Sequence, residues 1–102
     1  MLHVLAEIRL RPGARDAFVA EFRRLTPLVL AEDGCLEYAG ALEVPTALAA
    51  QAAVRDDVFT VVEKWRDEAA LAAHLAAPHM EDHRERARDL AAGVTIRVLR
   101  GI

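Results

Sequence analysis

The first ten residues alternate between apolar and polar side chains, and this pattern constrains the fold more than any other. Apolar residues recur at every second position: Leu2, Val4, Ala6, Ile8 and Leu10. The positions between them include His3, Glu7 and Arg9. Because successive side chains of a strand point to opposite faces, the pattern predicts a strand over 2–10 with one apolar face. Such a face must be buried against another layer, so the segment requires a sheet.

A helical pattern follows the turn at 11–13. Its apolar positions are Phe18, Phe22, Leu25 and Val29, which recur at the spacing of one helix face. Pro27 removes one intrahelical hydrogen bond, so we expect it to bend the helix or to separate its last turn. Gly34 is expected to end the segment in a left-handed conformation.

The rest of the chain predicts two strands, a helical region in two pieces and a last strand. The strands are expected over 35–44 and 58–65, which are rich in Val and aromatic residues. Asp67 can cap the next helix, Pro78 interrupts it, and a second piece is expected to end at Gly93 before a strand around Val94 to Leu99. This order predicts a single α+β domain over 1–102, with a ferredoxin-like antiparallel sheet and helices on one face.

The alanine-rich segment 45–57 is too long for a tight hairpin. An irregular excursion, a helical turn and an arm that contacts a partner are all compatible with its composition.

The face of the sheet away from the helices is expected to be mixed. We expect it to carry Leu5, Phe59, Val61, Trp65 and Leu99 beside Glu7, Glu37, Glu63 and Arg97. That much apolar surface on an antiparallel sheet is better covered by a second sheet than by water. A chain of 102 residues also buries only about two-thirds of its unfolded surface by itself, which favours a homodimer.

Composition excludes several classes of partner. The net charge is −3 and Arg alternates with Glu, so no clustered basic face is available for nucleic acid. No run approaches the roughly 18 apolar residues of a membrane span, and we expect a cytoplasmic protein with no membrane partner. The single cysteine, Cys35, excludes an intramolecular disulfide.

Two histidines are candidate acid/base groups, because imidazole titrates near neutrality. His74 lies in an apolar helical stripe with Leu71 and Pro78, so its ring should point toward the sheet. His79 follows Pro78 at a helix start, where a proline break opens space for a ligand. A core histidine and a capping or exposed histidine are the structural alternatives for the two positions.

Five further residues are candidates for contact with a substrate: Tyr38, Glu63, Trp65, Met80 and His83. Packing alone could also account for Trp65, Tyr38 and Met80. His79 and His83 have the spacing of a helical metal pair, but no third and fourth ligands with a recognised spacing accompany them. Glycine-rich phosphate loops and dinucleotide fingerprints are missing too. We therefore expect no metal and no cofactor.

Several segments together resemble the antibiotic biosynthesis monooxygenase family, and its quinol monooxygenase members most closely. They are Met1 to Gly13, Glu32 to Cys35, Tyr38, Glu63 to Glu68, Ala70 to Leu75, Ala77 to Met80 and the ending from Val94 to Ile102. The resemblance implies a dimeric α+β barrel in which two sheets face each other. At the position of His83 such relatives tend to carry an aromatic residue, and this chain departs from them.

The resemblance also implies a reaction. A cofactor-independent monooxygenase would oxidise a small aromatic quinol or polyketide-like phenol with dioxygen, and a side-chain base would form the reducing anion in a dry pocket. Naphthoquinols, anthrones and catechols would all suit such a pocket. A non-catalytic small-molecule binding protein and an isomerase of a small phosphorylated or oxo metabolite remain alternatives.

Overall fold

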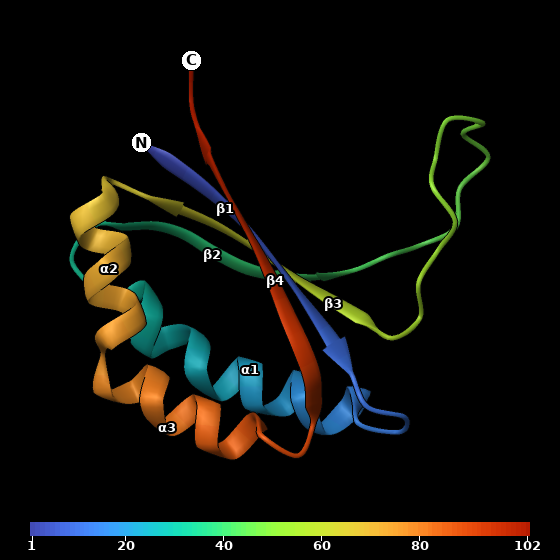
Figure 1. Cartoon of the computed structure of the whole chain (residues 1–102), viewed down its shortest axis with the longest axis horizontal. Helices are drawn as coiled ribbons and strands as arrows, with labels where there is room; N and C mark the ends of the chain where they lie inside the picture. The colour runs from blue at the N-terminus through green and yellow to red at the C-terminus, as the bar shows by residue number, and fades with distance from the viewer.

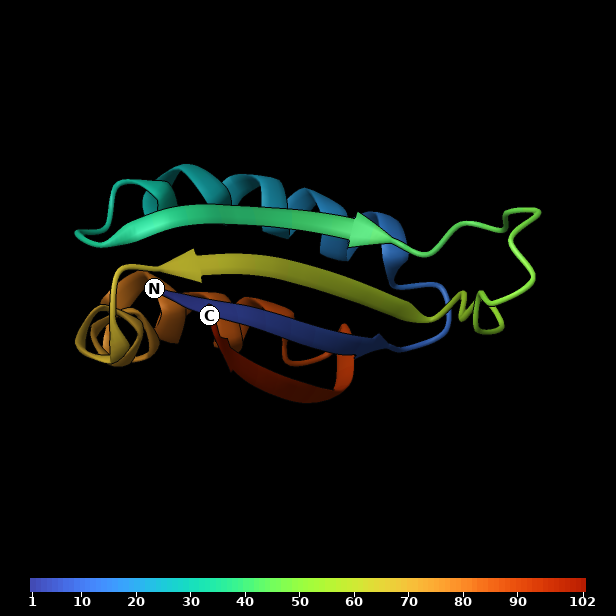
Figure 2. The same cartoon turned by 90° about the horizontal axis from the view of Figure 1, so that it is seen from above.

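Four antiparallel strands form one sheet, and three helices pack against one of its faces (Figures 1 and 2). The computed structural model describes residues 1–102. The elements are β1 (Leu2–Leu10), α1 (Arg15–Leu30), β2 (Cys35–Leu42), β3 (Val58–Trp65), α2 (Glu68–Ala76), α3 (Pro78–Ala87) and β4 (Ala91–Arg100). The strand order β2-β3-β1-β4 confirms the predicted ferredoxin-like α+β fold. No helix has the length and apolar character needed to cross a membrane.

The register of β1 against β3 decides which side chains enter the core. Even-numbered residues of β1 face the helices, and they pair with odd-numbered residues of β3: Val4 with Glu63, Ala6 with Val61 and Ile8 with Phe59. Paired residues share a face, so Phe59, Val61, Glu63 and Trp65 lie under the helices and are buried. The prediction that these four residues lie on the open face was wrong, because alternation within a strand does not reveal which face meets the helices.

The open face is nevertheless mixed. Leu5 pairs with Val62 on one side and with Arg97 on the other, and Leu99 pairs with His3. The polar residues on this face include Glu7, Glu37, Lys64 and Arg97. On the edge strand β4, Val94, Ile96 and Val98 share the helix side of the sheet but remain 57%, 51% and 50% exposed.

Aromatic packing joins α1 to the sheet. The helix buries the four predicted residues Phe18, Phe22, Leu25 and Val29. The rings of Phe18 and Phe22 lie 5.0 and 4.9 Å from that of Phe59, and Phe22 also stacks on Tyr38 at 5.3 Å. The helix continues through Pro27 to Leu30, with no separate last turn.

The helical region after β3 is interrupted at Pro78, as predicted. Asp67 caps α2, since its Oδ1 accepts a hydrogen bond of 2.8 Å from the Ala70 amide. Pro78 occupies the first turn of α3, where its missing N–H costs nothing. The expected end of this region at Gly93 was wrong, because Gly93 pairs with Arg9 inside β4. Pairing of β1 with β4 extends to Ala91, so the helix has to end earlier, at Ala87.

The segment between β2 and β3 is an irregular excursion that projects away from the sheet (Figure 1). Gln51 makes hydrogen bonds within the segment. Its Nε2 donates to the Val44 carbonyl at 2.6 Å, and its Oε1 accepts from the Thr46 amide at 3.0 Å. Arg55 ties its base to the sheet through ion pairs with Glu43 and Glu7. Side-chain bonds thus replace regular secondary structure here.

The turn between α1 and β2 should be intolerant of any side chain at Gly34. This residue has φ of 83°, and an added Cβ would lie 2.6 Å from the Ala70 Cβ. Gly34→Ala should therefore lower the free energy of unfolding by more than the roughly 1–2 kcal/mol of a left-handed alanine. Gly13→Ala is the matched control, because Gly13 has φ of 77° and no atom within 4 Å. Urea unfolding of both variants measures the difference, and equal losses would contradict the predicted clash.

Candidate active site

A cavity of about 240 Å³ lies between the sheet and the pair α2 and α3. Most of its walls are apolar, with Ala6, Ile8, Val61 and Ile96 from the sheet and Leu75 and Met80 from the helices. The polar residues that line it are Tyr38, Glu63, His74, His83, Arg84 and Arg88. Five of the seven predicted site residues therefore line one cavity: Tyr38, Glu63, His74, Met80 and His83. The other two do not line it: Trp65 is fully buried next to His74, and the side chain of His79 is 23% exposed.

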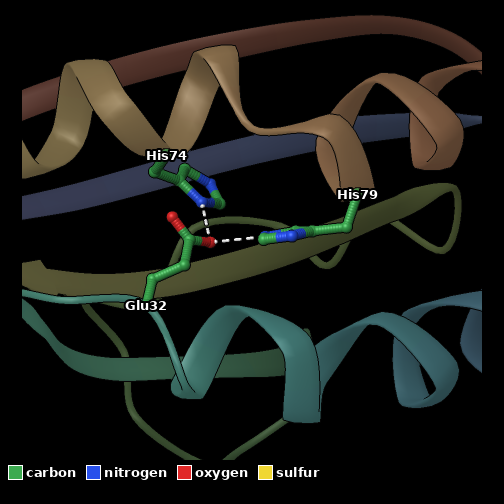
Figure 3. Close-up of side chains that lie close together, drawn as sticks. All are labelled: Glu32, His74 and His79. Atoms are coloured by element: carbon green, nitrogen blue, oxygen red, sulfur yellow. Dashed lines mark hydrogen bonds and ion pairs between the residues drawn. The ribbon is translucent and has the colours of Figure 1, made fainter.

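His74 lies on α2 and is almost fully enclosed, with 1% of its surface exposed. Its Nδ1 is 2.8 Å from Oε2 of Glu32, in the turn that follows α1 (Figure 3). Its Nε2 is 4.0 Å from Oε1 of Glu63, beyond hydrogen-bond distance. The Trp65 ring packs on the imidazole with 4.5 Å between centroids. These contacts fix the orientation of the ring.

Glu32 also binds the second predicted histidine. His79 Nε2 lies 2.7 Å from the same oxygen, Oε2, so one carboxylate bridges α2 and α3 across the Pro78 break (Figure 3). Sequence reasoning did not select Glu32 as a site residue. It lies 42 and 47 residues from its two partners, and no local spacing connects them. The resemblance had included Glu32 only as part of a matching segment.

The environment of His74 favours the neutral ring. Burial lowers its pKa below 6.5, and the hydrogen bond and charge of Glu32 oppose that shift. A neutral imidazole beside a carboxylate places its proton on Nδ1, where it is donated to Glu32. Nε2 then carries the free lone pair. Every fully buried polar side-chain atom has a hydrogen-bond partner, whereas His74 Nε2 has none, so Nε2 is not fully enclosed. Because His74 lines the cavity, we infer that Nε2 faces it.

Glu63 and Tyr38 complete the polar wall around His74. Burial raises the pKa of the Glu63 carboxyl, although the 2.9 Å hydrogen bond that Trp65 Nε1 donates to it acts in the opposite direction. Trp65 thus positions Glu63 from behind the wall. Burial, and then the charge of Glu63, raise the pKa of the Tyr38 hydroxyl. Tyr38 therefore remains a phenol, able to donate a hydrogen bond to a ligand oxygen.

His83, on α3, is held in a separate pair. Its Nδ1 lies 2.6 Å from Oε2 of Glu21 on α1, and Arg24 donates two hydrogen bonds of 2.6 and 2.9 Å to the same carboxylate. His79 and His83 contact different carboxylates, so they do not form the helical metal pair that their spacing allowed. Glu21, like Glu32, was missed because its partner is distant in sequence, by 62 residues.

One cluster has the residue types of a metal site. The ligand atoms of Glu32, His74 and His79 all lie within 4.8 Å of one another. The two imidazole nitrogens are at hydrogen-bond distance from a single carboxylate oxygen, closer than ligands around a tetrahedral ion lie to each other. Proton sharing accounts for this arrangement, and a divalent ion would have to displace the proton on His74 Nδ1.

Comparison with known proteins agrees with the geometry. Residues 1–86 match the model of the family described as "Antibiotic biosynthesis monooxygenase". The chain is 37% identical over 101 residues to "Probable quinol monooxygenase YgiN" of Escherichia coli, covering 97% of this chain and 96% of that protein. The crystal structure of PA3566 from Pseudomonas aeruginosa has a TM-score of 0.81 and 29% identity over 99% of this chain and 93% of its own. For Rv0793 from Mycobacterium tuberculosis the TM-score is 0.80 and the identity 26%, with 99% and 94% covered.

Replacing Glu32 should change the protonation of His74 without removing its packing. The carboxylate raises the His74 pKa against the effect of burial, so Glu32→Gln should lower that pKa further. Nitrogen chemical shifts of labelled histidine, followed by NMR against pH, measure both the pKa and the tautomer. Glu81→Gln, at an exposed position of α3, is the matched control. An unchanged His74 pKa in Glu32→Gln would show that the bridging carboxylate does not control the base.

Proposed function

Because the chain belongs to the antibiotic biosynthesis monooxygenase family, we propose that it oxidises a small aromatic quinol or polyketide-like phenol with dioxygen, without metal or organic cofactor. The observation that carries the proposal is an oriented base in a mostly apolar cavity: His74, whose Nδ1 is bound to Glu32 and whose Nε2 has no hydrogen-bond partner. The description of the relative YgiN, "Probable quinol monooxygenase", supports the same class of substrate.

The proposed chemistry begins with proton transfer. His74 Nε2 accepts the proton of a substrate hydroxyl, and the Glu32 carboxylate stabilises the imidazolium that forms. The resulting anion is electron-rich and reduces dioxygen, which then adds one oxygen atom to the ring. The other oxygen atom leaves as water, so an arenediol and dioxygen give an oxygenated quinone and water. Tyr38 can donate a hydrogen bond to the second substrate oxygen.

The size and walls of the cavity suit this chemistry. A volume of about 240 Å³ lies below the roughly 300–1,000 Å³ of typical drug-sized ligand sites, so the occupant is small. A substrate that fills this mostly apolar cavity would displace water, which would strengthen the interaction of the anion with His74 and protect reactive oxygen intermediates from side reactions.

A second candidate function is isomerisation of a small oxo metabolite. Glu63 favours it, because its carboxyl, with a raised pKa, lies 4.0 Å from His74 Nε2. Two such groups could remove and return a proton beside a carbonyl. A panel of reduced quinones in an oxygen electrode, with a chelator present, tests the first function against this one. Oxygen uptake supports the monooxygenase, and binding without uptake supports either the isomerase or a binding protein.

We further propose that the protein is a cytoplasmic homodimer whose open sheet faces meet. The mixed character of that face, with Leu5, Val62 and Leu99 among charged residues, supports a partner sheet. The single cysteine is in keeping with a reducing compartment.

His74 variants should separate the base from the fold. His74→Phe and His74→Asn should each lower turnover of a quinol on the order of a hundredfold or more. Asn keeps an amide nitrogen near Nδ1 for Glu32 but has no group at Nε2. In the wild type, kcat/KM should rise with pH through a pKa below 6.5, because burial lowers the pKa of His74. The variants should lack this rise, and their kcat/KM should increase only near the phenol pKa of about 10. Normal turnover of both variants at pH 7 would refute the assignment.

A charge on the open face should weaken the dimer. Leu99→Glu would place a carboxylate between facing sheets, at a cost of a few kcal/mol of association free energy. Light scattering after size exclusion should show a dimer for the wild type and monomer for the variant at micromolar concentration. Leu48→Glu, in the exposed excursion, is the control. A monomeric wild type would remove the proposal of facing sheets.

A further inference from the structure

We propose that His83 and Glu21 form a second proton-accepting site in the same cavity, so that the substrate is an arene with two hydroxyl groups, one held by each histidine. The inference rests on the proposed function and narrows its substrate class. A single base would suit a monohydric phenol or an anthrone equally well. Two oriented bases favour a diol.

The two histidines are held in the same way. Each belongs to the helical region after β3, and each has its Nδ1 at hydrogen-bond distance from a carboxylate on or just after α1: 2.8 Å for His74 and Glu32, and 2.6 Å for His83 and Glu21. A carboxylate only accepts hydrogen bonds, so in the neutral form of either ring the proton lies on Nδ1 and the lone pair on Nε2.

The free nitrogen of His83 opens into the cavity. His83 lines the cavity and is only 9% exposed. Its Nε2 has no hydrogen-bond partner in the chain, yet no buried polar side-chain atom is left without one. Nε2 is therefore not fully enclosed, and we infer that it faces the cavity that His83 lines. An unpartnered acceptor in a mostly apolar wall is positioned to receive a ligand hydroxyl.

Several hydrogen bonds and ion pairs fix the position of the Glu21 carboxylate. Its side chain is 9% exposed, and Arg24 binds both of its oxygens while lying 3.5 Å from Asp82 of α3. These bonds keep Glu21 in place. Desolvation raises the pKa of its carboxyl, but the hydrogen bonds from Arg24 and His83 outweigh that effect and hold the pKa below its ordinary value. The phenyl ring of Phe18 packs edge-on to His83, with 6.1 Å between centroids. The imidazole thus has one fixed orientation.

Two bases balance the chemistry of a diol. Both substrate O–H bonds break, and His74 and His83 each take one proton. The electrons released by the ring reduce dioxygen, one oxygen atom bonds to a ring carbon, and the O–O bond breaks. The C–H bond at that carbon also breaks, and its proton ends on the new oxygen as a hydroxyl group. The second oxygen atom takes the two protons back from the imidazolium groups and leaves as water. Both histidines return to the neutral form, ready for another cycle.

The test compares two ligands, of which the second has a methyl group in place of one hydroxyl hydrogen of the first. Affinities for 1,4-dihydroxynaphthalene and its monomethyl ether are measured without oxygen on the wild type, His83→Asn and the control Glu81→Gln. Asn retains an amide nitrogen for Glu21, which separates loss of Nε2 from loss of the structural bond, and thermal unfolding checks the fold. We expect His83→Asn to weaken binding of the diol about tenfold and to leave binding of the ether unchanged. Oxygen uptake with the diol should fall on the order of a hundredfold.

The outcomes separate the inference from the function on which it rests. Equal effects on the two ligands, no effect on either, or a wild type that binds neither would overturn the second site. Uptake of oxygen by the wild type that His83→Asn leaves unchanged would overturn it too, while the proposed function stands. Binding that follows the expected pattern in a wild type that consumes no oxygen would instead support the diol site and remove the monooxygenase. If His83→Asn unfolds, Glu21→Gln replaces it, with the same ligand-dependent loss expected.

Discussion

The candidate site depends on carboxylates that reach from one side of the helical layer to histidines on the other. Glu32 bonds to His74 and His79 through a single oxygen, and so links α2 to α3 where Pro78 separates them. Arg84 of α3 adds a second link, since its guanidinium donates a hydrogen bond to the Leu75 carbonyl of α2. The bond to Glu32 also fixes which nitrogen of His74 carries the proton. The hydrogen bonds of Glu32 therefore both link the two helices and orient the His74 ring.

The cavity combines apolar walls with a few ionisable groups whose pKa values burial moves in opposite directions. Burial lowers the pKa of His74 and raises that of Glu63, and both shifts favour the neutral forms. The two shifts have one physical cause, because burial removes the hydration that stabilises the charged form of each group. Trp65 contributes from behind the wall, because its indole N–H holds Glu63 while its ring supports His74.

Sheet register sets the position of this chemistry. Tyr38 on β2 pairs with Glu63 on β3, and Glu63 pairs with Val4 on β1. Side chains of paired residues share a face, so these two polar groups enter the same cavity under the helices. A shift of the register by one residue would move both to the open face and leave His74 against apolar side chains alone. The strong pairing of β1 with both neighbours guards against such a shift.

The sequence by itself determined the order of the elements, the buried face of α1, the cap at Asp67 and the break at Pro78, because each depends on residues within one or two turns of each other. It also selected five residues that line the cavity. It did not predict the pairing of His83 with Glu21. Only the tertiary structure decided which face of β3 meets the helices, where β4 begins, and which carboxylates hold the histidines. Those outcomes depend on register and on contacts such as Glu32 with His74 and Glu21 with His83, which join residues 42 and 62 positions apart. Alternation and helical spacing describe one element at a time, and they carry no information about which element lies opposite.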